Sequence, residues 1–179
     1  MTAIIGFIKN KKVYIGGDSI ASNGYNKDIR KDGKIFENNG FIFGCTTSFR
    51  MIQILQFSFK PPKQKGKELF EYMCTDFVDA IREQFKKSGY EKKESDGEDK
   101  GGVFIVGRKG RLFKIESDFQ VGEYEDFTTC GCGGVLATGA MEVLKDSKLS
   151  PSRIIEKALW VTEKFDVNVS RPFKVIKTK

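Results

Sequence analysis

The chain has 179 residues, with 31 lysines and arginines against 24 aspartates and glutamates, and it contains no histidine. The formal net charge is +7, and the 39% hydrophobic and 31% charged residues are typical of a folded globular protein, not of a disordered one. The absence of histidine excludes Ser-His-Asp and Cys-His catalysis, together with every zinc site that depends on imidazole.

The length predicts one domain over residues 1–179, since a chain of this size can bury a sizeable core. No apolar run approaches the roughly 20 residues that span a bilayer, and Met1 precedes strand-like sequence rather than a signal peptide. We therefore expect a cytoplasmic protein without a membrane partner.

Four cysteines are present, and without an export signal they are predicted to be reduced thiols: Cys45, Cys74, Cys130 and Cys132. Cys130 and Cys132 are predicted to lie on one face of a strand, because side chains alternate along strands. A metal site at this pair is the alternative interpretation, but a second close pair of ligands is missing from the sequence. We expect no metal and no cofactor.

The basic residues occur in scattered groups that are flanked by acidic or turn residues, a pattern typical of solvated surface. No nucleic-acid-binding motif accompanies them, so we expect no nucleic-acid partner. The groups lie at residues 11–12, 60–67, 86–87, 92–93 and 108–111.

The N-terminal half is predicted to form two hairpins followed by two helices. The first hairpin joins strands over residues 3–9 and 12–17 through a turn at Asn10 and Lys11, and residues 18–33 are interpreted as a polar loop. The remaining elements are strands over 34–37 and 41–46, a helix capped by Ser48 that extends to about residue 59, and a helix over 67–87 with apolar residues at three- and four-residue steps.

The C-terminal half is predicted to begin with a mobile surface loop over residues 88–102, which are charged and contain glycine. Ser150 and Pro151 have the pattern of a helix start. The predicted elements are strands over 103–108 and 111–116, helices over 135–145 and 151–165, and a final strand over 173–177.

This order of elements predicts the α+β class, because strand runs and helix runs are segregated instead of alternating. A four-layer αββα sandwich of two mainly antiparallel sheets satisfies the order. Sheets that are covered on both faces also explain strands as apolar as residues 103–106.

Six segments of the sequence resemble, in order and with matching spacing, the proteasome β-subunits and the bacterial proteasome-like peptidase HslV. The resemblance covers nearly the whole chain and implies the fold of the N-terminal nucleophile (Ntn) hydrolases. The matching segments are MTAIIG (1–6), VYIGGDS (13–19), Lys34-Ile35, FGCTTS (43–48), GCGGVLATGA (131–140) and LSPSRIIEKAL (149–159).

The resemblance implies a catalytic centre that needs no histidine. Its nucleophile would be Thr2, exposed by removal of Met1, with its own α-amine as the base. Asp18 and Lys34 would lie beside it, where the ammonium favours the deprotonated hydroxyl and the neutral amine while the carboxylate holds the ammonium. Asp166 would assist the amine through hydrogen bonds.

Three residues depart from the family pattern. Cys132 stands where the family has a serine near the amine, and Val169 stands where another serine is expected. Thr47 replaces a glycine whose backbone N–H contributes to the oxyanion hole, and its β-branched side chain would narrow the entrance to the pocket.

The resemblance also implies where a substrate would bind. Ser22 and Thr47 would bracket an extended peptide that pairs as an added strand. Cys45 and Phe49 are candidate walls of the specificity pocket.

The function predicted from these matches is a threonine-type endopeptidase that assembles into a homo-oligomeric ring and cleaves peptides or unfolded proteins. A separate ATP-dependent unfoldase would be needed for folded substrates, because the sequence contains no nucleotide-binding motif. Two alternatives remain open: a catalytically silent ring subunit, and an amidase of the same fold that acts on a small molecule.

Overall fold

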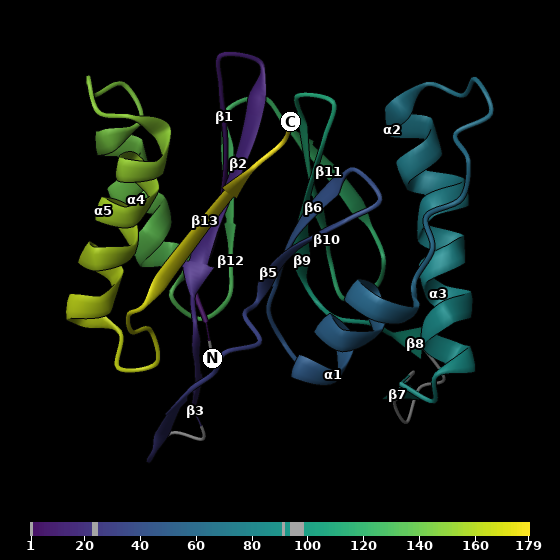
Figure 1. Cartoon of the computed structure of the whole chain (residues 1–179), viewed down its shortest axis with the longest axis horizontal. Coiled ribbons are helices and arrows are strands. Elements are labelled where there is room, and N and C mark those ends of the chain that lie inside the picture. The colour runs from purple at the N-terminus through teal and green to yellow at the C-terminus, as the bar shows by residue number, and fades with distance from the viewer. Residues whose placement is uncertain (1, 23–24, 91, 94–98) are drawn as a thin grey trace.

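Two antiparallel sheets lie face to face in the computed structural model, which describes residues 2–22, 25–90, 92–93 and 99–179 (Figure 1). One sheet contains, in spatial order, β12 (Phe127–Cys130), β1 (Ile4–Lys9), β2 (Lys12–Asp18) and β13 (Phe173–Lys177). The other contains β11 (Val121–Tyr124), β10 (Arg111–Ile115), β9 (Phe104–Arg108), β6 (Phe41–Cys45) and β5 (Ile35–Asn38).

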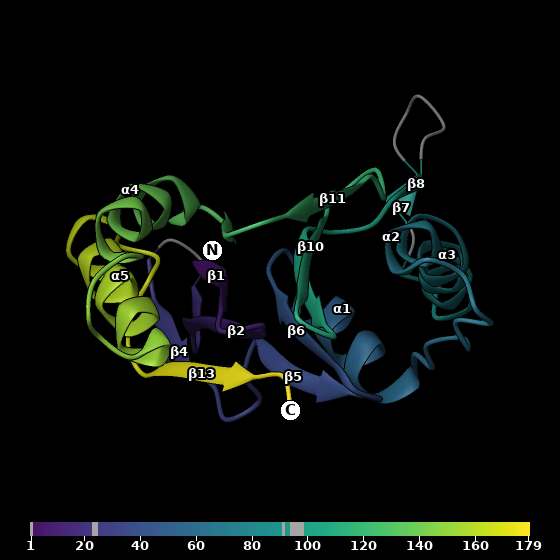
Figure 2. The same ribbon diagram turned by 90° about the horizontal axis from the view of Figure 1, so that it is seen from above.

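A layer of helices covers the outer face of each sheet (Figures 1 and 2). The sheet of β1 is covered by α4 (Gly134–Leu144) and α5 (Pro151–Phe165). The sheet of β6 is covered by α1 (Phe49–Gln53), the π-helical η1 (Ile54–Ser58), α2 (Leu69–Tyr72), the π-helical η2 (Met73–Phe77) and α3 (Val78–Lys87). The predicted α+β class and the αββα sandwich are therefore confirmed.

Each of the three spaces between the layers is filled by buried apolar side chains. The space under α1–α3 is rich in phenylalanine, with the rings of Phe41 and Phe77 4.9 Å apart. Mainly aliphatic side chains such as Ile4 and Ile105 fill the space between the sheets, and Ile155 and Leu159 fill the space under α5. Burying one such side chain contributes about 1.5–3 kcal/mol.

Glycines on the inner faces allow the two sheets to approach closely. A Cβ atom at Gly44 of β6 would lie 2.5 Å from side-chain atoms of both Ile4 and Ile15 in the facing sheet. Because real Cβ contacts are longer than this, the spacing between the sheets depends on glycine at this position.

Most predicted elements are confirmed, and the turn residues explain why. Asn10 and Lys11 join β1 to β2 with φ of 54° and 59°, as the two-residue turn of a hairpin requires. Ser48 caps α1 by accepting a hydrogen bond from the backbone N of Arg50 at 3.1 Å. The helix predicted over 67–87 begins at Leu69, because the carboxylate of Glu68 occupies the cap.

Both predicted loops contain short strands, and two other strands were not predicted. The predicted loop over 18–33 contains a short hairpin, β3 (Ile20–Ser22) and β4 (Lys27–Ile29), and the strands β11 and β12 were not predicted. Of the predicted mobile loop, residues 91 and 94–98 lie outside the description, while β7 (Lys92–Lys93) pairs with β8 (Asp99–Lys100).

The expectation that Cys130 and Cys132 share one strand face is wrong. Strand β12 ends at Cys130, and the φ of +96° at Gly131 reverses the chain, so Cys130 is buried whereas Cys132 is exposed. All four cysteines are free thiols. Within the described residues, no helix is long and apolar enough to cross a membrane, and no three potential metal ligands of the His, Cys, Asp or Glu type cluster together.

Candidate active site

Thr2 lies at the head of β1, where it is 3% exposed and is held by the turn that follows β12. Its carbonyl oxygen accepts a hydrogen bond from the backbone N of Gly133 at 3.2 Å. Its backbone N donates to Sγ of Cys132 at 3.1 Å. A Cβ atom at Gly131 would lie 2.2 Å from the Thr2 oxygen, so only glycine lets this turn pack against Thr2.

Asp18 and Lys34 form a buried ion pair that connects the two sheets. Asp18 ends β2, Lys34 immediately precedes β5, and their carboxylate and ammonium are 2.7 Å apart. The other Asp18 oxygen accepts from the backbone N of Ala3 at 3.0 Å, which ties the pair to the residue next to Thr2. The ion pair is therefore fixed with respect to the start of β1.

Burial disfavours the charged forms of Asp18 and Lys34, whereas the attraction between the two residues favours those forms. Burial raises the pKa of Asp18 above its ordinary value, while the neighbouring Lys34 acts in the opposite direction. Burial lowers the pKa of Lys34, again against the effect of Asp18. The result is an ammonium that is held in place and only weakly hydrated, which is the condition under which a charge acts most strongly on its neighbours.

A cleft of about 130 Å³ opens at Thr2 and Lys34. It brings together six of the predicted site residues. The lining also contains four residues that were not predicted as site residues: Ala21, Thr46, Ser48 and Ile52. The six predicted residues in its lining are Thr2, Ser22, Lys34, Cys45, Thr47 and Phe49.

Thr47 adopts the left-handed backbone conformation, with φ of 61°, in which glycine is usually found. Its hydroxyl accepts a hydrogen bond from the backbone N of Val103 at 3.1 Å and contacts Oγ1 of Thr46 at 3.2 Å. These bonds stabilise the unusual conformation without glycine. Among the described residues the Thr47 backbone N–H has no hydrogen-bond acceptor, so it is available to a ligand in the cleft.

Cys45 and Phe49 are both in the lining of the cleft. Cys45 is fully buried, and burial raises the pKa of its thiol well above the ordinary value. The guanidinium of Arg30 stacks on the Phe49 ring at 4.0 Å from its centre. Sequence reasoning missed Arg30 because it lies in the segment that was interpreted as a loop.

Asp18, Cys132 and Asp166 are outside the lining of the cleft among the described residues. Asp18 lies behind Lys34, and Cys132 contacts the backbone of Thr2. The Asp166 carboxylate accepts from the backbone N of Asn168 at 2.8 Å, in the turn that follows α5. Val169 of that turn packs close to Gly133, which places the turn near the support of Thr2.

The two stacked sheets and their helix layers form the HslV-like Ntn-hydrolase fold, as the similar solved structures indicate. No protein-family profile matches the sequence, and no curated protein matches it. The similarity to known proteins is therefore one of structure.

Several solved structures are similar to this chain in fold. BPH of Thiobacillus denitrificans, in complex with epoxomicin, has a TM-score of 0.83 at 16% identity and covers 99% of this chain and 98% of its own. HslV of Trypanosoma brucei has a TM-score of 0.69 at 19% identity, covering 98% of both chains. An Anbu mutant from Hyphomicrobium sp. strain MC1 has a TM-score of 0.70 at 15% identity, covering 98% of this chain and 80% of its own.

Proposed function

We propose that this protein is a threonine-type endopeptidase whose nucleophile is Oγ1 of Thr2. Cleavage of the Met1–Thr2 bond would free the α-amine of Thr2, which then serves as the base. The observation that carries the proposal is the position of Thr2 in a cleft beside Lys34, whose ammonium is held by the buried carboxylate of Asp18. The three residue types and their spacing are those that the resemblance to HslV implies.

In the first step, Oγ1 of Thr2 attacks the carbonyl carbon of the scissile peptide bond while the neutral α-amine of Thr2 takes the hydroxyl proton. A free α-amine has an ordinary pKa of about 7.7–8.0, so a substantial fraction is neutral near pH 7.5. The proton then passes to the leaving amine, and the product is an ester between Thr2 and the acyl half of the substrate. A water molecule, activated by the same amine, hydrolyses the ester and restores the hydroxyl.

Lys34 and Thr47 would stabilise the negative charge that develops during these steps. Lys34 is in the lining of the cleft, and its ammonium would favour the alkoxide character of Oγ1. The Thr47 backbone N–H would donate to the oxyanion of the tetrahedral intermediate. Ser22, on β3, and Thr47 would pair with the backbone of an extended peptide from opposite sides.

We further propose that the protein works as a subunit of a homo-oligomeric ring, which limits access to unfolded chains and peptides. A separate ATP-dependent unfoldase would be needed to unfold folded substrates.

The small cleft supports a second candidate, an amidase that acts on a small molecule, because its volume of about 130 Å³ is below the roughly 300–1,000 Å³ of ordinary ligand pockets. A ring-sized particle that cleaves unfolded casein, but not simple amides, would favour the peptidase.

The nucleophile is tested by intact-mass measurement after incubation with epoxomicin. Its epoxyketone is suited to the hydroxyl and α-amine of an N-terminal threonine, so we expect one adduct on protein that lacks Met1. Thr2→Ala should give no adduct, whereas Cys132→Ser should keep it, which excludes alkylation of the nearby thiol. An adduct that persists in Thr2→Ala, or an unmodified Met1-free protein, would overturn the assignment.

A further inference from the structure

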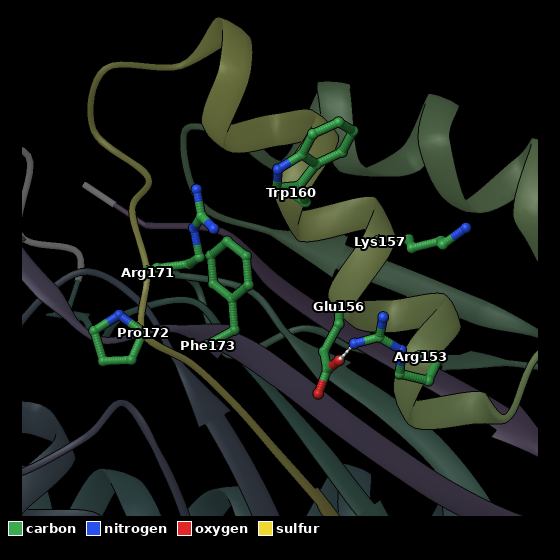
Figure 3. A pocket seen from close by; sticks show the side chains of 7 residues that line it. All are labelled: Arg153, Glu156, Lys157, Trp160, Arg171, Pro172 and Phe173. Carbon is green, nitrogen blue, oxygen red and sulfur yellow. Dashed lines mark hydrogen bonds and ion pairs between the residues drawn. The ribbon is translucent and has the colours of Figure 1, made fainter.

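A second groove lies on the other side of the β1 sheet from the sheet of β6, between α5 and the residues that lead into β13 (Figure 3). Its volume is about 900 Å³, and it shares no lining residue with the cleft at Thr2. The lining comes from α5 (Arg153, Glu156, Lys157 and Trp160) and from the segment that enters β13 (Arg171, Pro172 and Phe173).

The groove carries more positive than negative charge. Its three cations face a single lining carboxylate, that of Glu156, which accepts a hydrogen bond from Arg153 at 2.6 Å. Arg171 donates to Glu163 at 2.8 Å. In the described part of the chain Lys157 is exposed and has no acidic partner. An incoming carboxylate can therefore bind Lys157 without breaking an internal ion pair.

The groove also exposes apolar surface that its own helix does not need for packing. Trp160 is 46% exposed, although the opposite face of α5 is buried through Ile155 and Leu159. Pro172 and Phe173 lie across from it (Figure 3). A partly exposed tryptophan beside cations is typical of a protein-binding surface, where aromatic residues dominate the binding free energy.

Strand β13 gives this groove an extended backbone edge. Among the described residues β13 has β2 as its only neighbour in the sheet and therefore leaves its other edge unpaired. Lys177 on the same strand is exposed, and its side chain projects from the sheet face that also carries Phe173. An extended peptide can add to such an edge through main-chain hydrogen bonds, and Lys177 increases the attraction for acidic side chains.

We propose that this groove binds an extended acidic peptide segment of a partner protein, with an apolar side chain of the segment on Trp160 and Phe173 and its carboxylates on Lys157, Arg153 and Arg171. A free phosphate ion fits less well, because it has no apolar group to place on Trp160 and Phe173. Arg153 and Arg171 each already donate a hydrogen bond to a carboxylate within the chain, so their positions are suited to binding a carboxylate.

The test uses the fluorescence of Trp160, which is the single tryptophan of the chain. The probe is the acetylated and amidated hexapeptide EEFDIE, titrated into the Thr2→Ala protein so that the peptide is not cleaved. We expect a saturable change in Trp160 emission that weakens as salt is added. The charge-reversed peptide KKFKIK and an EEFPIE peptide, whose proline cannot donate to the strand edge, should bind at least tenfold more weakly.

Matched variants locate the binding on the groove. Lys157→Glu and Arg153→Glu should each weaken EEFDIE binding by about tenfold or more, whereas Lys86→Glu, an exposed lysine on α3 in the opposite helix layer, should leave it unchanged. Equal effects of Lys157→Glu and Lys86→Glu, or equal binding of KKFKIK, would overturn the proposal. A Trp160 emission that changes with protein concentration but not with added peptide would also overturn the proposal, because the groove would then be an interface between copies of this chain.

Discussion

Lys34 has an environment in which small changes of side-chain shape should have large effects. It is 3% exposed, and its ammonium is 2.7 Å from the Asp18 carboxylate. Lys34 lines the same cleft as Thr2. Its partner in the ion pair comes from the other sheet, so neither residue would be held without the sandwich.

Lys34→Ala should lower kcat/KM by roughly 10²-fold or more, the scale of losing one preorganised electrostatic group. Lys34→Arg should fail as well, because a planar guanidinium does not replace a compact ammonium in a closed space. The measurement is hydrolysis of a fluorogenic peptide by variants whose far-ultraviolet circular dichroism matches the wild type. Full activity of Lys34→Arg would show that the lysine has no catalytic role.

Cys132 contacts Thr2 and stands where the family that the sequence resembles has a serine. Its Sγ accepts from the Thr2 nitrogen at 3.1 Å, and a sulfur atom is a weaker hydrogen-bond partner than a hydroxyl. Cys132→Ser should orient the α-amine better and raise kcat, or leave it unchanged, with little effect on KM. Loss of activity in Cys132→Ser, together with retained activity in Thr2→Ala, would identify a cysteine enzyme instead.

At the scale of single residues, the sequence could indicate the charged and nucleophilic groups but not what supports them. Thr2, Asp18 and Lys34 can be singled out from the sequence because their types and spacings match the pattern of the family that it resembles. The support of Thr47 by Val103 joins residues 56 positions apart. Such a contact depends on the pairing of β6 with β9, which no local pattern reveals.

The elements were predictable where local chemistry defines them. The turn at Asn10 and Lys11 and the cap at Ser48 are encoded by neighbouring residues. Strands β11 and β12 were missed because each has only four residues, and half-buried positions in both weaken the alternation. Strand β12 pairs with β1, which lies more than a hundred residues earlier in the chain.

The close approach of the sheets at β6 should make Gly44 intolerant of even one methyl group. Gly44→Ala would put a Cβ atom 2.5 Å from side chains of the facing sheet, so we expect a loss of about 1–3 kcal/mol in the free energy of unfolding, measured by urea denaturation. Gly139→Ala in α4 is the matched control. Nothing lies within 4 Å of that Cβ position, and removing a helical glycine should add about 0.5–1 kcal/mol. Similar effects at both positions would contradict this account of the packing.

Helix α2 is anchored to the preceding loop by Tyr72, and this contact should be sensitive to alkaline pH. The Tyr72 hydroxyl donates to the Pro62 carbonyl at 2.7 Å, and burial raises its pKa to about 12. The folded protein therefore holds this proton between pH 10 and pH 12, where the unfolded chain, with a tyrosine pKa of about 10, releases it. The stabilisation from Tyr72 is complete below pH 10 and is lost as the pH rises toward 12.

Tyr72→Phe removes both the hydrogen bond and the proton. At pH 8 the variant should be less stable than the wild type by about 1 kcal/mol. Between pH 8 and pH 11 the wild type should lose about 1.4 kcal/mol more than the variant does, as a shift of about two pKa units requires. Urea unfolding at the two pH values measures both differences, and parallel losses in the two proteins would contradict the raised pKa.

At the scale of the whole molecule, the helix layer of α4 and α5 leaves apolar residues in solvent. Val135, Val143, Phe165 and Val167 are 84%, 83%, 72% and 87% exposed. Exposed apolar residues in such numbers are typical of surfaces that contact another chain. We expect light scattering to detect a ring-sized species several times heavier than 20.2 kDa, and Val143→Glu to reduce its mass. A clean monomer at micromolar concentration would contradict the ring and favour the small-molecule amidase.

The two sheets are completed at different times during synthesis of the chain. The sheet from β5 to β11, with α1–α3 against it, comes from one continuous stretch, residues 35–124. The sheet that carries Thr2 needs both ends of the sequence, because β2 pairs with β13. A growing chain on the ribosome can therefore fold its middle early, while β2 stays unpaired on that side until residues 173–177 have emerged. The sheet that begins beside Thr2 is therefore expected to close after the sheet of β6, whose strands all lie before residue 125.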